Sequence, residues 1–281
     1  FSDGISEELL NLLARIPELR VTARTSSFAF KGKDVNVREI ARSLEVAHIL
    51  EGSVRKAGDR VRITAQLIEA RSDTHLWSET YDRELDDIFA IQEEVAGAIS
   101  HALMLELAAP GHSSAPPVVY PAANPAAYDA FLMGRELLHH RKRVPTMDEA
   151  IGHLKRALRL DARYAPAHAL VGIASAMSTA SVQEAKWKAM PHLERARKLD
   201  PELPEVYGGY ALLDISVDPA SAVKHARKAL QLNPNYSDAM NWLSMSLQKL
   251  GRFGEAEDTL KRMMEIDPMR PMAFHNYVSL L

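Results

Sequence analysis

The feature that most constrains this chain is an internal repeat in its second half. Four segments end alike, with basic and apolar residues followed by Asp or Asn: residues 156–161, 195–201, 228–234 and 262–268. Their spacings are 39, 33 and 34 residues, measured between the markers Asp161, Asp200, Asn233 and Asp267. A period of this size indicates one supersecondary unit stacked several times, because a single unit cannot bury its own apolar face. The second half is therefore predicted to be a stack of helical units.

Each unit reads as two amphipathic helices, and a period near 34 residues resembles the tetratricopeptide repeat, or TPR. Small residues recur where the two helices would cross: Gly134, Gly172, Ala211 and Ser244 in first helices, and Ala150, Ala189, Ala222 and Ala256 in second helices. Small residues let the helix backbones approach, and large ones should fill the space that remains: Leu154, Leu193, Leu243 and Leu260. We expect about four repeats plus one terminal helix in residues 124–281.

The repeats depart from the template in three places. The inner turns of the first two repeats are longer, at residues 141–145 and 178–182. Pro191 falls within the second helix of the second repeat, where an interior proline costs about 3 kcal/mol, so we expect this helix to begin near Met190 or to kink. Residues 271–281 supply one further first helix. Because repeat arrays end in a polar capping helix, we expect more chain to follow.

Residues 109–123 are rich in proline and separate the repeats from a different first half. Proline lacks a backbone donor and disfavours helix before it, so this stretch is predicted to be an extended linker. Residues 1–108 then form a domain of their own, with mixed helix and strand periodicity.

The first domain is predicted from its changing periodicity. Helices are expected over residues 5–16, after a capping box at Asn36 and Glu39, and over 88–103. Strands are expected at 19–24, 47–55, 60–70 and 74–81, and residues 26–31 are expected to form a loop. Short turns join the last three strands, which predicts an antiparallel meander. The fold class is an α+β domain, with helices on a mainly antiparallel sheet, followed by an all-α TPR superhelix.

Four stretches of the first domain resemble the TolB amino-terminal-like domain of bacterial regulators: residues 1–8, 23–32, 50–55 and 77–83. The resemblance covers nearly all of residues 1–105. In that family a strand commonly precedes the segment that begins here at Phe1, so the resemblance implies that an edge of the sheet is missing. The chain also begins without Met, and we expect it to be a piece of something longer.

Composition excludes several functional classes. The chain has no cysteine, which excludes disulfides, thiolate metal sites and cysteine nucleophiles. Its net charge is −3 and neither half is strongly basic, which argues against nucleic-acid binding. No window approaches about 18 consecutive apolar residues, so these residues predict no membrane partner. No spacing typical of a nucleophile, phosphate loop or metal cluster occurs, so we expect no cofactor, no metal and no enzymatic activity.

The TPR resemblance implies a concave face, lined by first helices, that holds a protein or peptide. Template alignment assigns to this face Phe131, Arg135, Leu138, His139, Ala169, Ile173, Met177, Leu212, Asn241, Met245, Gln248, Lys249 and His275. The lining is mixed apolar and polar. It lacks the Lys- and Asn-rich clamp by which some TPR proteins hold a C-terminal carboxylate, so that ligand class is not predicted.

Two functional hypotheses follow. In the first, the chain is a noncatalytic protein or peptide interaction and sensing module of a bacterial regulator. Similar TolB-like and TPR pairs sit behind adenylate or guanylate cyclase domains or CadC-like winged-helix domains, often with a membrane span between, which favours the periplasmic side. Neither effector lies in these residues. In the second, the α+β domain binds a small molecule or nucleotide and the repeats serve dimerisation.

The two hypotheses make different demands on the first domain. A pocket with convergent polar groups beside Arg24, Arg55, Trp77 and Tyr81 would favour a small molecule. An apolar sheet without a pocket would favour protein contact. The aromatics Phe28, Phe30, Trp77 and Tyr81 are candidates for a second contact surface, although packing also explains the strand pair Trp77 and Tyr81. A cut sheet edge and an uncapped array would both favour a homodimer.

Overall fold

The computed structural model describes residues 2–14, 19–58, 60–84, 94–95, 97–98, 125–139 and 144–280. The chain divides into two compact units, residues 2–120 and 121–281. The linker predicted at 109–123 lies outside the described residues, as does most of the helix predicted at 88–103. The domain boundaries therefore stay predictions, and each unit is described by itself.

Among the described residues of the first unit are the short helices α1 (Ser2–Leu13), α2 (Arg24–Phe28) and α3 (Val37–Leu44). Helix α1 buries Leu9, Leu12 and Leu13. It overlaps the helix predicted over residues 5–16, but it begins at Ser2 and ends at Leu13. Helix α3 starts as expected, because the side chain of Asn36 accepts a hydrogen bond from the backbone N–H of Glu39 at 2.9 Å.

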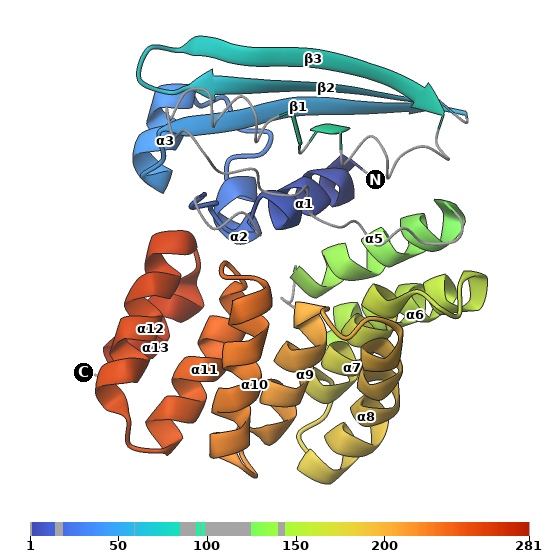
Figure 1. The fold of residues 1–281 in the computed structure, drawn as a ribbon, viewed down its shortest axis with the longest axis vertical. Coiled ribbons are helices and arrows are strands. Elements are labelled where there is room, and N and C mark those ends of the chain that lie inside the picture. Colours follow the sequence, from blue (N-terminus) through green and yellow to red (C-terminus); the bar gives the residue numbers. More distant parts are fainter. Residues whose placement is uncertain are drawn as a thin grey trace. The chain divides into compact units, whose positions relative to one another are not determined.

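The sheet has three antiparallel strands in the order β1 (His48–Ala57), β2 (Arg60–Glu69) and β3 (Thr74–Glu84). The predicted meander is therefore confirmed. In β2, Val61, Ile63, Ala65 and Leu67 are buried, whereas Arg60 and Arg62 are exposed. Figure 1 shows α1, α2 and α3 on one side of this sheet, and α1 and α3 both contact β1. The first unit is an α+β layer structure.

Two local predictions in the first unit are wrong. Residues 19–23 form no strand, and α2 occupies part of the predicted loop at 26–31. A strand needs a neighbour for its backbone groups, and no described strand pairs with residues 19–23. The carbonyl oxygen of Ala23 is bonded by the start of α2 instead of by a strand. It accepts hydrogen bonds from the backbone N–H groups of Ser26 and Ser27 at 3.2 and 3.1 Å.

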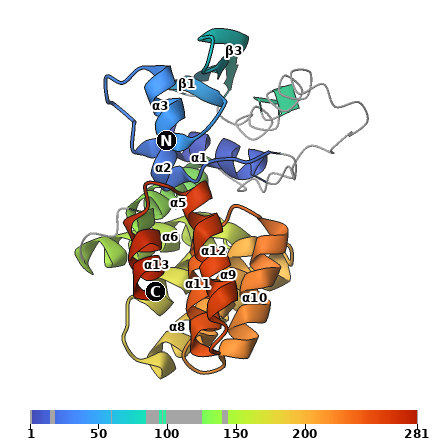
Figure 2. The ribbon, with the colours of Figure 1, turned by 90° about the vertical axis from the view of Figure 1, so that its left-hand side faces the viewer.

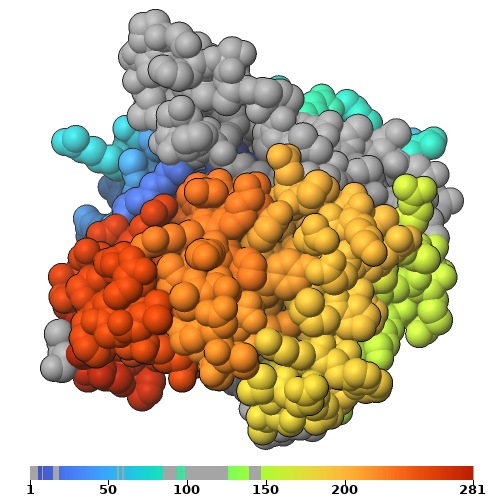
Figure 3. Space-filling model, turned by 60° about the horizontal axis from the view of Figure 1, so that its bottom comes forward, coloured from blue at the N-terminus to red at the C-terminus, as the bar shows by residue number. Residues whose placement is uncertain are grey.

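The second unit is a succession of helix pairs. Its helices are α5 (Pro125–His139), α6 (Val144–Leu160), α7 (Ala165–Met177), α8 (Val182–Leu199), α9 (Pro204–Asp214), α10 (Pro219–Leu232), α11 (Ser237–Lys249), α12 (Phe253–Ile266) and α13 (Pro271–Leu280). Each odd-numbered helix from α5 to α11 packs on the helix that follows it, and α5, α7, α9 and α11 also contact one another in turn. These first helices form one layer. Figure 2 shows the helix pairs succeeding one another, and in Figure 3 the surface of this unit follows the same chain order from yellow-green to red.

The small residues lie at the helix crossings, as predicted. Ala150, Ala189, Ala222 and Ala256 all have no exposed surface. Gly172 shows why the position must be small: a Cβ atom there would lie 2.7 Å from Cγ of Leu193, which is itself fully buried. The period of the sequence therefore follows from a steric requirement that each helix pair repeats.

The repeat markers have a structural role that the sequence did not reveal. Asp161, Asp200 and Asn233 each accept a hydrogen bond on Oδ1 from the backbone N–H two residues later, at 2.9, 2.9 and 3.0 Å. Such Asx turns direct the chain from one repeat into the next. An Asp or Asn recurs at this point because a short side-chain oxygen can mimic a backbone turn.

The expectation for Pro191 is wrong in one respect. Helix α8 begins at Val182, with Ser181 as its cap, and continues through Pro191 to Leu199. Proline removes the hydrogen bond to the carbonyl of the residue four positions earlier, here Trp187. The side chain of Trp187 is 76% exposed, so this turn of the helix faces solvent, and water can satisfy the carbonyl.

Candidate functional site

The layer of first helices carries the residues predicted to hold a partner. We call their side the first-helix face, defined by the described members of the predicted set on α5, α7, α9, α11 and α13. The side chain of His139 lies outside the described residues. The other members divide into a buried group toward α5 and α7 and an accessible group on α11 and α13.

The buried group packs rather than faces outward. Phe131 is 2% exposed and contacts the ring of Tyr164 edge to face, with 5.0 Å between the ring centroids. Arg135 is 6% exposed and places its guanidinium 4.9 Å from the Phe131 ring. Leu138, Ala169 and Ile173 are also buried. These side chains hold helices together and leave little area for a partner.

The accessible group lies on α11 and α13. Met245, Lys249 and His275 are exposed, and Asn241 and Gln248 are half-buried. Met177 and Leu212, on α7 and α9, are half-buried against the neighbouring core. The accessible face therefore combines a flexible apolar side chain with amides, an imidazole and a lysine ammonium group, a mixture suited to a polar peptide.

One residue of this face was missed by the sequence reasoning. Asn276 donates a hydrogen bond through Nδ2 to Oδ1 of Asn241 at 2.7 Å, which joins the amides of α13 and α11. Asn241 in turn places its Nδ2 3.8 Å from Sδ of Met245. The sequence did carry a signal for Asn276, because it directly follows His275, which the template alignment assigns to this face.

A polar cluster fixes the start of α11 against the turn before α13. Arg270 donates to Oγ of Ser237 at 2.8 Å and forms an ion pair with Asp238. Ser237 Oγ donates to Oδ2 of the fully buried Asp267 at 3.0 Å. Buried charges are stable only when they are paired in this way. The cluster therefore positions the two helices that carry the accessible group.

The second predicted surface, in the first unit, does not form one cluster. Phe28 and Phe30 are half-buried beside a cavity, and the guanidinium of Arg24 lies 4.3 Å from the Phe28 ring centroid. Arg24 also forms a buried ion pair with Glu7 at 3.0 Å. Trp77 and Tyr81 lie on β3 and do not line that cavity.

Tyr81 behaves as a core residue with a satisfied hydroxyl. Its side chain is 3% exposed and its hydroxyl donates to Oε2 of Glu79 at 2.5 Å. Burial, followed by the bond to Glu79, raises the pKa of Tyr81 above its usual range. Trp77 pairs with Leu67 and is half-buried. Both positions fit sheet-face packing.

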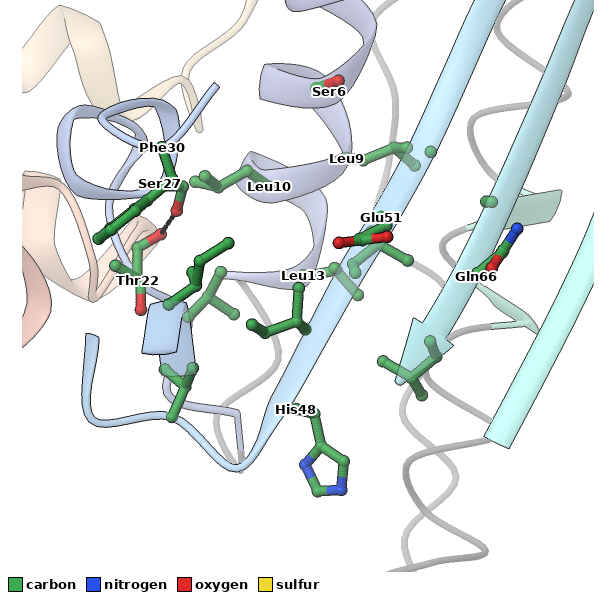
Figure 4. A pocket seen from close by; sticks show the side chains of 18 of the residues that line it. Ser6, Leu9, Leu10, Leu13, Thr22, Ser27, Phe30, His48, Glu51 and Gln66 are labelled. Atoms are coloured by element: carbon green, nitrogen blue, oxygen red, sulfur yellow. Dashed lines mark hydrogen bonds between the residues drawn. The ribbon is translucent and has the colours of Figure 1, made fainter. Parts of the chain in front are cut away.

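The cavity in the first unit has a volume of about 970 Å³. It lies between α1, the edge strand β1 and residues 19–22, and Figure 4 shows Leu9, Leu10 and Leu13 of α1 on its wall. Ser6, Thr22, Ser27, His48, Glu51 and Gln66 add polar groups. Residues 19–22, which belong to the predicted strand at 19–24, thus line a cavity together with α1 and β1.

The cavity differs from the pocket that the sequence reasoning required. Arg55, Trp77 and Tyr81 do not line it, and neither does Arg24. Its wall is predominantly apolar, with the charged groups of Arg20, Lys31, Glu45 and Glu51 at different points. Such a lining suits an apolar ligand better than a phosphate group, which needs converging cations or backbone amides.

Among the described residues, no group of three or more His, Cys, Asp or Glu side chains gathers closely enough to hold a metal ion. None of the helices in the described part of the chain combines the length and apolar character needed to cross a membrane.

Comparison with known proteins agrees with the helix pairs. The tetratricopeptide repeat family matches residues 217–274, which include α10, α11 and α12. The described architecture is thus a three-stranded antiparallel sheet followed by helical repeats of the TPR class. Proteins of this class generally mediate protein–protein interaction and their fold is typically noncatalytic.

A relative in Rhizobium meliloti (strain 1021) carries the name "Putative adenylate cyclase 3". It is 41% identical over 173 residues, which are 62% of this chain and 29% of that protein. The chain therefore spans less than a third of the length of this curated relative.

Solved structures with similar folds include TTC0263, a thermophilic TPR protein in Thermus thermophilus, with 15% identity, a TM-score of 0.46, and coverage of 70% of this chain and 94% of that chain. Another is pilF of Pseudomonas aeruginosa, with 18% identity, a TM-score of 0.44 and coverage of 56% and 68%. A third is YrrB, a TPR protein with an unusual peptide-binding site, with 24% identity, a TM-score of 0.36 and coverage of 56% and 75%.

Proposed function

We propose that this chain is a noncatalytic interaction and sensing module of a bacterial signalling regulator, and that it holds a protein or peptide on the first-helix face. The observation that carries the proposal is the accessible group on α11 and α13, within and beside the segment that matches the TPR family. There, Met245, Lys249 and His275 remain exposed while the same layer is buried toward α5 and α7.

The chemistry of the accessible group limits the partner. The amides of Asn241 and Asn276 already bond to each other, yet each amide has further donor or acceptor positions. These can bond an extended peptide backbone, while Met245 offers an adaptable apolar contact and Lys249 attracts acidic side chains. We therefore propose a peptide segment of mixed apolar and acidic character.

The regulator role rests on similarity. The Rhizobium meliloti relative aligns with this chain over 173 residues at 41% identity, and its name refers to a cyclase. The resemblance to TolB-like and TPR pairs points the same way, toward a receiving module attached to an effector. We propose that the effector activity belongs to other parts of such a protein, and that these residues receive the signal.

The test is capture of a partner with the full chain, followed by binding measurements with a peptide from the partner identified. The double variant Met245→Glu and Asn241→Ala should weaken binding at least tenfold, roughly 1.4 kcal/mol or more, because it introduces a charge and removes an amide from the face. Lys224→Ala, an exposed change on α10, is the matched control.

Unchanged binding in the double variant, with circular dichroism equal to the parent chain, would contradict the first-helix face. Equal weakening in the Lys224→Ala control would also contradict it. A turnover measurement with purified chain tests the noncatalytic part: substrate conversion that scales with chain concentration would overturn it.

The cavity favours a second candidate function, in which the first unit senses a small molecule and the repeats serve dimerisation. Its predominantly apolar wall suits an apolar or amphipathic compound. An apolar fluorescent probe should bind the full chain, and an apolar or amphipathic compound that enters the same cavity should displace it. Leu10→Glu, on the cavity wall, should abolish probe binding, and Arg42→Ala, exposed on α3, should leave it unchanged. Equal probe binding in both variants would exclude the cavity.

A further inference from the structure

A histidine pair joins the two helices of the second repeat. His168 lies on α7 and His192 on α8, and both side chains are half-buried. Their Nδ1 atoms are 3.1 Å apart and their ring centroids 5.3 Å apart. Neither residue belongs to the first-helix face as predicted, and no role in the repeat template requires a histidine at either position.

The tautomer of His168 follows from its second contact. Its Nε2 lies 3.2 Å from the carbonyl oxygen of Ala162, which can only accept a hydrogen bond. Nε2 therefore carries the proton, and Nδ1 presents a lone pair that accepts a hydrogen bond from Nδ1–H of His192 at 3.1 Å. A backbone carbonyl on the far nitrogen is the arrangement that commonly orients a histidine for metal binding.

We propose that His168 and His192 form a binding site for a divalent first-row transition-metal ion. Two imidazole nitrogens that bind one ion at about 2.0–2.1 Å lie roughly 2.8–3.0 Å apart at a right angle and roughly 3.3–3.4 Å apart at the tetrahedral angle. The observed Nδ1 separation of 3.1 Å lies between these two values. His192 needs only to carry its proton on Nε2, and small ring rotations then direct both lone pairs at one ion.

The residues around the pair determine what else a bound ion would meet. The described residues offer no third His, Asp or Glu ligand in a group with this pair, so water completes the coordination. Lys155 and Arg195 oppose a cation while Asp161 favours one. A site with two imidazoles and this charge balance binds Cu²⁺ most tightly, with Ni²⁺ and Zn²⁺ weaker, because that order holds for nitrogen ligands in general. A bound ion would tie α7 to α8.

The test is calorimetric titration of the full chain, without any histidine tag, with CuCl₂ at pH 7.5. We expect a site of one ion per chain that His168→Gln and His192→Gln each weaken at least about tenfold. Cu²⁺ should also raise the melting temperature of the parent chain and leave that of either variant unchanged. His225→Gln is the matched control, because His225 lies on α10 beside Asp214.

Absence of binding, or binding that the two variants leave unchanged, would overturn the site. Equal weakening in His225→Gln would assign the ion elsewhere and also overturn it. Folding of each variant is checked by circular dichroism before titration. If a variant unfolds, Cu²⁺ titration of the parent chain with nitrogen couplings in its electron paramagnetic resonance spectrum decides: couplings from two imidazoles support the site, and their absence contradicts it.

Discussion

The two units bury their apolar residues in different ways. In the repeats, each helix pair fits a large side chain such as Leu193 against a small one such as Gly172, and both are buried. In the first unit, the wall of α1 that faces β1 includes the half-exposed Leu10 and borders a cavity of about 970 Å³.

The difference shows what repetition does for packing. A repeat makes its contacts with the helices next to it in the chain, so a short sequence pattern suffices to specify them. A sheet needs a neighbour for every strand, and the described sheet leaves β1 at an edge. Close packing is thus local in one unit and depends on distant pairing in the other.

The largest expected effect separates the two kinds of packing. Leu193→Ala should lower the free energy of unfolding by about 2–5 kcal/mol, because it opens a void among fully buried neighbours. Leu10→Ala should cost less than about 1.5 kcal/mol, because its site is already partly open. Urea unfolding monitored by circular dichroism measures both. Equal losses would remove the distinction between the units.

The next effect tests the steric reason for the small residues. Helix propensity alone would make Gly172→Ala stabilising by about 1 kcal/mol. The added Cβ would lie 2.7 Å from Leu193, so we expect a net loss of about 1–3 kcal/mol instead.

The matched control for this change is Gly152→Ala on α6, where a Cβ meets nothing within 4 Å, and it should stabilise by roughly 0.5–1 kcal/mol. Thermal unfolding gives both signs. Stabilisation by Gly172→Ala would show that Leu193 and the backbones of α7 and α8 can shift to accommodate the added methyl group.

Helix caps should contribute alike in both units, because they are local. Asn36→Ala in the first unit and Ser181→Ala in the second each remove an acceptor from the third N–H beyond it, at 2.9 and 3.3 Å. We expect losses of about 1 kcal/mol, with the smaller value for the longer Ser181 bond. Chemical denaturation measures the difference. A much larger loss of stability from Asn36→Ala than from Ser181→Ala would mean that α3 also stabilises the three-stranded sheet.

The smallest effect is a pH dependence confined to the repeats. Burial lowers the folded-state pKa of His168 and His192, while an unfolded histidine titrates near pH 6.5. Below pH 6.5 the unfolded chain binds more protons, so stability falls as the pH falls toward the folded-state values. The melting temperature should therefore decrease from pH 7.5 to 5.5, and less so in the double variant His168→Gln and His192→Gln. An equal decrease would assign the effect to other groups.

Prediction from the sequence succeeded where contacts are local. The start of α3 at Asn36 and the helix crossings at Ala189 and Ala222 depend on residues within about 40 positions in the sequence. It failed at residues 19–24, where a strand was predicted and only a pairing partner could have made one. Of the candidate site, the alignment identified Met245 and Lys249, which are accessible, but also Phe131 and Arg135, which are buried.

The sequence by itself determined the period, the helix pairs and the meander, because small residues, caps and turn residues act over short distances. The tertiary structure alone decided which first-helix residues remain accessible, where the cavity lies, and that His168 and His192 meet across α7 and α8. Those features depend on how helices and strands are placed against one another, and residues 24 positions apart carry no mark in the sequence of their 3.1 Å contact.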